Sequence, residues 1–376
     1  VAVAGGWFGK DIYIIGTTGQ VVQHMTTAGM VRDLHWWPEH RLLLVGCDDE
    51  KVIAFDEEGQ RKWEFTSQMD PAVFRTGKDY WFKSAPGQHG IHGLYTGTFL
   101  EGKSQVVVGS DCTIEILDEH GQLVKRLPAF WGLPSVFTII KQPNGRLALL
   151  AGRKNNGNNT VAVVDSRSVT VTSEDFASVP EGATYVDGWA SMNRHHLFYE
   201  DMAGDGHKVV VGDINGSYNR ITLWDTGGRA LYDAAFGPGP GYGGGSQLRR
   251  DTYDNRNVRD MSIADLDGDG KKEVVVGLWS GCVLVLDHQL RRVWSVSMPD
   301  TPSVLKTVPV TSDASCWIVV ASENGTVTVL DSEGVVLRTD KVEGLPTFID
   351  SFTDSDGSPV VVIGTRRGFV QAFRLK

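Results

Sequence analysis

The residues best suited to chemistry form an acidic stretch in the last third of the chain. Asp265, Asp267 and Asp269 stand at alternate positions, and Gly270 and Glu273 follow. Alternating carboxylates around a glycine that permits a sharp turn form the oxygen cage that hard cations prefer. The stretch therefore predicts a loop that binds calcium as a structural brace. The predicted metal-site residues are Asp265, Asp267, Asp269, Lys271 and Glu273.

Two other stretches share part of this spacing. In the first, Asp201 and Asp205 are kept, but Ala203 and Val209 replace two of the expected ligands. In the second, Phe352 stands where the first carboxylate is expected, ahead of Asp354 and Asp356. Because a cation needs most of its oxygen ligands, we expect neither stretch to bind metal.

A second group of reactive side chains lies in three long segments, residues 67–90, 176–194 and 237–257, which carry His, Tyr, Trp, Lys and Arg in an acidic protein. Such residues suit β-elimination of a uronate, which needs a base, an acid and a cationic group beside the carboxylate. The candidate catalytic residues are His89 and His92 as base, Tyr80, Tyr242 and Tyr253 as acid, and Arg249 and Arg250 as neutralising groups. The candidate substrate-binding residues are Lys78, Trp81, Lys83, Trp189, Arg194, His195 and Arg256.

Each of these residues also has a purely structural interpretation. Aromatic and arginine side chains in long loops can pack on one another simply to order the loop. The glycine- and proline-rich residues 237–246 suit a mobile lid or a flexible connection equally well.

A repeat supplies the elements that must position both groups. An apolar run such as VVVG (residues 274–277) is followed by a second run ending in Asp (VLVLD, residues 283–287), then by a turn and a third strand. Eight such units recur about every 40–45 residues, the spacing of a propeller blade. The sequence predicts an all-β fold, a single β-propeller over residues 1–376 with eight four-stranded antiparallel blades, or seven as the alternative. The first unit lacks its innermost strand and the last its outermost.

Strand order then decides which face carries which group. The three long segments each join an outer strand to the inner strand of the next blade, so we expect all three on one face, above the channel. The acidic stretch joins the first and second strands of its blade, so we expect it on the opposite face.

The repeat carries a family resemblance. Residues 54–63 (AFDEEGQRKW) and 286–294 (LDHQLRRVW) resemble the tryptophan-docking motif of PQQ-like repeats, in which the tryptophan packs between blades. Residues 264–277 (ADLDGDGKKEVVVG) resemble the calcium-binding FG-GAP repeat of integrin-type propellers. Together they imply a propeller similar in architecture to the propeller-type rhamnogalacturonan and ulvan lyases.

Composition and charge restrict the classes of partner and metal that the chain can bind. A net charge of −10 argues against nucleic acid, and no apolar run approaches the roughly 20 residues of a membrane span. The four cysteines form no CxxC motif, which argues against a zinc site. Calcium dependence suits a secreted or periplasmic protein, and a chain that opens within a strand suits part of a larger multidomain protein.

Three functions remain open. The first is a polysaccharide lyase acting on an acidic, uronate-containing polysaccharide or oligosaccharide. The second is a non-catalytic propeller that binds glycan or protein. The third is a glycoside hydrolase, which needs a pair of carboxylates. The candidates for that pair are Asp79, Asp187, Asp251 and Asp254. A PQQ-dependent dehydrogenase is disfavoured because the adjacent cysteines of many such enzymes are absent.

Overall fold

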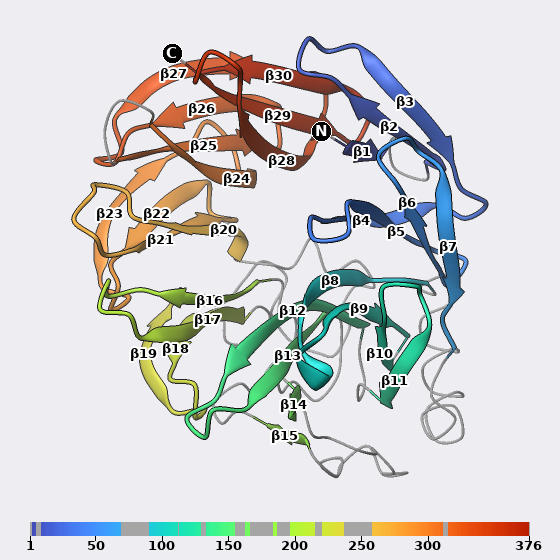
Figure 1. The fold of residues 1–376 in the computed structure, drawn as a ribbon. Helices are drawn as coiled ribbons and strands as arrows, with labels where there is room; N and C mark the ends of the chain where they lie inside the picture. The colour runs from blue at the N-terminus through green and yellow to red at the C-terminus, as the bar shows by residue number, and fades with distance from the viewer. Residues whose placement is uncertain are drawn as a thin grey trace, which may run out of the picture.

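The computed structural model describes residues 2–4, 9–68, 90–111, 113–128, 133–154, 162–165, 183–185, 196–214, 220–236, 258–310 and 315–375. In these residues the chain forms antiparallel sheets that follow one another in chain order around a ring (Figure 1). One short 3-10 helix, η1 (Leu100–Gly102), joins β8 to β9.

Six sheets are complete four-stranded blades, each with its strands paired in chain order. The first three are β4–β7 (Val31–Trp37, Leu42–Cys47, Lys51–Phe55, Arg61–Thr66), β8–β11 (Gly93–Thr98, Ser104–Ser110, Thr113–Leu117, Leu123–Pro128) and β12–β15 (Leu133–Lys141, Leu147–Lys154, Ala162–Asp165, Ala183–Tyr185). The others are β16–β19 (Leu197–Asp201, Lys208–Ile214, Arg220–Trp224, Ala230–Ala235), β20–β23 (Val258–Ala264, Glu273–Leu278, Cys282–Leu286, Arg292–Ser297) and β24–β27 (Pro302–Pro309, Cys316–Ser322, Thr326–Leu330, Val336–Lys341).

The two remaining sheets stand at the ends of the described chain and have three strands each. They are β1–β3 (Ala2–Ala4, Asp11–Ile15, Val21–Thr26) and β28–β30 (Pro346–Thr353, Pro359–Thr365, Val370–Arg374). The prediction of eight four-stranded blades, or of seven, is therefore wrong, because among the described residues six sheets have four strands. The repeat motif recurs in both terminal sheets, but among the described residues β1 pairs with β2 alone and β30 with β29 alone.

One further boundary differs from the prediction. Residues 176–194 were expected to form a single insertion, but β15 (Ala183–Tyr185) lies within them and pairs with β14. The long connection there begins after Tyr185. A three-residue outer strand is too short to show an alternating apolar pattern, which explains why the sequence hides it.

The hydrophobic core lies between successive sheets. The second strand of a blade is buried on both faces, as in β5 and β29, which explains its unbroken apolar sequence. Val275 and Val285 of one blade, for example, share a cluster with Ile318 of the next. Each sheet thus buries its apolar side chains against its neighbours, as in other repeat architectures.

The predicted Asp-x-x-Gly turns are present between the third and fourth strands. Asp56 accepts the backbone N–H of Gln60 at 2.7 Å, and Gly59 takes a positive φ of 74°. Asp118 makes the same contact with Gln122 at 2.8 Å. The aspartate caps the turn, and glycine allows the left-handed backbone that a tight hairpin requires.

A side chain on the outer strand fastens each of several sheets to the next. Trp63 Nε1 donates to the carbonyl of Glu119 at 3.0 Å, and Trp294 Nε1 donates to that of Ser332 at 2.8 Å. Each accepting carbonyl belongs to the turn before the outer strand of the following blade. Gln23 and Arg338 donate to the following sheet from the equivalent position. The tryptophan-docking contact predicted from the sequence is thus confirmed.

We expect Trp294→Phe to destabilise the protein by about 1–2 kcal/mol. The substitution removes the indole N–H that donates to the Ser332 carbonyl, and it replaces the packed indole with a smaller phenyl ring. Urea unfolding followed by circular dichroism measures the change. Trp279→Phe is the control, since Trp279 is 45% exposed and the same substitution there should stay within about 0.5 kcal/mol. Equal losses in the two variants would contradict a docking role.

Candidate functional site

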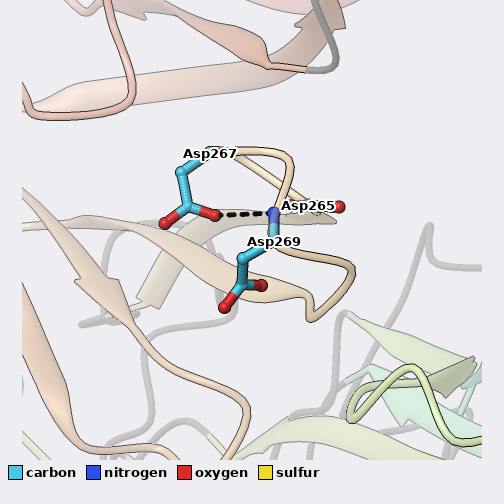
Figure 2. A group of neighbouring side chains, drawn as sticks. All are labelled: Asp265, Asp267 and Asp269. Atoms are coloured by element: carbon cyan, nitrogen blue, oxygen red, sulfur yellow. Dashed lines mark hydrogen bonds between the residues drawn. The ribbon is translucent and has the colours of Figure 1, made fainter.

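The acidic stretch forms the turn between β20 and β21. β20 begins at Val258, where residues 237–257 end, and it runs to Ala264, next to the acidic turn. The turn therefore lies at the opposite end of β20 from that long connection, as predicted. Figure 2 shows the three aspartates on the turn.

Backbone N–H groups of the turn fix the aspartate side chains. Asp265 accepts from Gly268 at 2.8 Å and from Gly270 at 2.9 Å, and Asp267 Oδ1 accepts from Asp269 N at 3.1 Å (dashed in Figure 2). One carboxylate oxygen from each of Asp265, Asp267 and Asp269 lies within 4.8 Å of the others. Such closely spaced carboxylates repel one another unless a cation stands between them.

Glu273 adds a fourth carboxylate beside them. Burial, together with the negative charges of the three aspartates, raises the pKa of Glu273 to about 7. A 2.9 Å hydrogen bond from Leu266 N favours the charged carboxylate but does not outweigh these effects. The donor set is thus all oxygen and strongly anionic, which fits a hard divalent cation such as calcium. Lys271 directs its ammonium at Asp269 (3.5 Å), so only its backbone carbonyl could serve as a ligand.

The two degenerate stretches occupy the equivalent turn of their own sheets but differ from the acidic turn in their side chains. Asp201 accepts backbone N–H groups from Gly204 and Gly206 just as Asp265 does, but Ala203 contributes no oxygen where Asp267 stands. In the last sheet Arg374 pairs with both Asp354 and Asp356. A guanidinium thus already neutralises the carboxylates there. That neither stretch binds metal stays a prediction.

We expect Asp267→Asn to weaken calcium binding about 10-fold or more, because the loop loses a charge and part of its oxygen cage. Isothermal titration calorimetry on the metal-free protein measures the affinity. Asp356→Asn is the matched control, since Asp356 lies in the degenerate turn of the last sheet and the substitution should leave calcium affinity unchanged. Unaltered affinity in Asp267→Asn would exclude this loop as the calcium site.

The long-segment face is described only in part. Of the candidate catalytic and substrate-binding residues, His92 alone lies within the described residues. His92 precedes β8, and its Nε2 lies 2.9 Å from Asp111 Oδ1, with both side chains nearly buried. The others lie outside the described residues: Lys78, Tyr80, Trp81, Lys83, His89, Trp189, Arg194, His195, Tyr242, Arg249, Arg250, Tyr253 and Arg256.

The structure adds His196, which the site prediction passed over in favour of His195. Its Nε2 lies 3.0 Å from Asp260 Oδ1, and its Nδ1 lies 3.3 Å from Asp213 Oδ2. Burial opposes a charged ring, but the two carboxylates outweigh burial and raise the pKa of His196 to about 9. The ring is therefore a buried cation that joins two blades. Nothing local in the sequence reveals this, because Asp260 is 64 residues away.

The outer strands carry an unusual apolar surface. Val335, directly before β27, and Val336 and Leu337, the first two residues of β27, are 55%, 51% and 50% exposed, respectively. Val21 and Val22 on β3 are similarly exposed. Three consecutive exposed aliphatic residues at an outermost strand form an aggregation-prone surface. Proteins ordinarily avoid such a surface unless it serves as a binding site.

Among the described residues there is no helix of sufficient length and hydrophobicity to cross a membrane.

No protein-family model matches the chain, and no curated protein matches it. Solved structures do. Sqt1 of Saccharomyces cerevisiae is 13% identical with a TM-score of 0.68, over all of this chain and 93% of Sqt1. The Dos1 propeller is 12% identical with a TM-score of 0.61, over 96% of this chain and 81% of that one. BBS1N, solved in complex with ARL6DN, is 11% identical with a TM-score of 0.55, over all of this chain and 98% of that one. These likenesses show a β-propeller fold and do not show a resemblance to polysaccharide lyases.

Proposed function

We propose that this chain is a non-catalytic propeller that binds a protein partner, with β27 as part of the contact surface. The observation that carries the proposal is the run of three half-exposed aliphatic residues, Val335, Val336 and Leu337. Contiguous exposed apolar surface marks sites of protein association on soluble domains. The likeness to BBS1N, a chain solved in complex with ARL6DN, supports the same class of function.

The proposal includes a structural calcium ion in the Asp265–Glu273 loop. The three clustered aspartates, each with a carboxylate oxygen within 4.8 Å of the others, support it. Such an ion would neutralise the loop and hold its turn in place. Calcium at extracellular concentrations suits this role, so we propose a secreted or periplasmic location.

The test compares Val336→Lys with Val293→Lys. Both valines are more than half exposed on outer strands, but Val293 has no aliphatic run beside it. We expect wild type and Val293→Lys to capture the same partner from the source organism. Val336→Lys should lose that partner while it retains its circular dichroism spectrum. The captured partner, purified, should then bind the wild type directly. Equal capture by all three proteins would overturn the assignment of β27.

A second measurement addresses catalysis. Wild-type protein is incubated with pectic, algal and glycosaminoglycan uronates, and absorbance near 235 nm is followed for unsaturated product. The binding proposal predicts no increase. An increase with any of these substrates would replace the binding proposal with the lyase hypothesis, whose residues other than His92 lie outside the described ones.

A further inference from the structure

The calcium loop, residues 265–273, is packed against the equivalent turn of the preceding blade. Lys272 N donates to the carbonyl of Met202 at 2.9 Å, and Lys272 Nζ lies 2.8 Å from Glu200 Oε2. On the other side, Cys316 N, in the following blade, donates to the carbonyl of Leu266 at 3.1 Å. The loop therefore bridges three successive blades.

The two turns approach each other closely at Gly204 and Gly270. Gly204, in the preceding blade's turn, has no room for a side chain, because a Cβ there would lie 2.2 Å from the carbonyl oxygen of Gly270. Gly270 is the turn residue of the calcium loop, and its N–H donates to Asp265. Any atom that pushes on the Gly270 carbonyl therefore also displaces the backbone that orients Asp265.

We propose that Gly204 is a positioning residue for the calcium loop, and that cation binding is coupled to the contact between the β16–β19 and β20–β23 blades. The proposal rests on the structural calcium ion proposed above. Gly204 would hold the Gly270 carbonyl where Asp265 is correctly oriented, although Gly204 itself contributes no ligand atom.

Thermodynamic linkage makes the coupling reciprocal. If loss of the Gly204 contact weakens calcium binding by some factor, then calcium must strengthen the blade contact by the same factor. Calcium should therefore slow hydrogen exchange of the Lys272 amide, the loop amide that bonds across this contact to Met202, and not only of amides whose bonds stay within the loop.

The chain offers a matched pair of variants. Gly204 and Gly206 share one turn and both have positive φ, +70° and +85°, so alanine strains the backbone at either position. A Cβ at Gly206, unlike one at Gly204, would meet no atom within 4 Å. The difference between Gly204→Ala and Gly206→Ala therefore isolates the contact with Gly270 from the strain.

Calcium affinity is measured by calorimetry on the metal-free full chain, and hydrogen exchange is measured with and without calcium. We expect Gly204→Ala to bind calcium about 10-fold more weakly than Gly206→Ala, within the range of typical coupling between sites. Equal affinities in the two variants, with wild type binding calcium, would overturn the positioning role alone. Absence of binding by the wild type would instead overturn the proposed calcium site.

Should Gly204→Ala fail to fold, Glu200→Gln provides a second route that leaves the backbone unstrained. It removes the ion pair with Lys272 across the same blade contact. We expect weaker calcium binding and faster exchange of the Lys272 amide. If this variant matched the wild type in both measurements, the coupling would be disproved.

Discussion

Replacement of His196 by alanine is expected to destabilise the protein by about 3–5 kcal/mol, the usual cost of breaking a buried ion pair by removal of one partner. Asp213 is fully buried and Asp260 is largely buried, and the variant removes the ring that lies within 3.3 Å of both carboxylates. Asp260 also accepts the N–H of Leu305 in the next blade at 2.8 Å. The damage should therefore extend across three blades.

The pH dependence follows from the raised pKa of His196. The imidazolium binds its proton more tightly in the folded state, with a pKa of about 9 against 6.5 for the free side chain. Its stabilisation is thus fully present below pH 6.5 and is lost as pH rises through about 9. The shift corresponds to about 3 kcal/mol. The difference between wild type and His196→Ala should shrink over this window.

Urea unfolding at several pH values measures both effects. His24→Ala is the control, because His24 forms a His–Asp pair of similar length with Asp11, but with both side chains nearly half exposed. An exposed pair contributes at most about 1 kcal/mol. If the two histidine variants lost equal stability, or if the His196 effect did not depend on pH, the buried-cation interpretation would be wrong.

Local sequence chemistry predicted the local structure well. Asp56 and Gly59 predict their turn because the capping hydrogen bond and the positive φ involve residues four or fewer positions apart in the sequence. Trp63 and Trp294 were identified because the stretches that contain them resemble the tryptophan-docking motif of PQQ-like repeats. The acidic turn was placed correctly because its position between two strands of one blade is a matter of chain order.

Properties that depend on distant partners could not be predicted. The sequence indicated that the first and last units each lack a strand, but whether another segment completes the sheets β1–β3 and β28–β30 depends on which strands pair. His196 beside His195 offers no local sign that two aspartates, 17 and 64 residues away, make it a buried cation. The role of Gly204 likewise arises from a turn in another blade.

Replacement of Arg126 by alanine is expected to have a comparably large effect, a loss of about 3–5 kcal/mol at neutral pH. Glu115 in β10 stands opposite Arg126 in β11, and its carboxylate, fully buried, lies 2.8 Å from Arg126 Nε. Burial already raises the pKa of Glu115 despite this partner and a hydrogen bond from Gln68 N. Without the guanidinium the buried charge has no ionic partner among the described residues.

Two measurements identify the cause of that loss. Because burial raises the pKa of Glu115 above its usual 4.5 in the folded state, its protonated form favours the folded state, so the deficit of Arg126→Ala should narrow as pH falls toward about 4.5. Glu115→Gln, added to Arg126→Ala, should recover most of the stability at neutral pH, since a buried amide carries no charge. Arg229→Ala, which removes an exposed pair with Asp225, should cost at most about 1 kcal/mol. A double variant no more stable than Arg126→Ala would show that packing of the arginine stem, rather than the buried carboxylate, sets the loss.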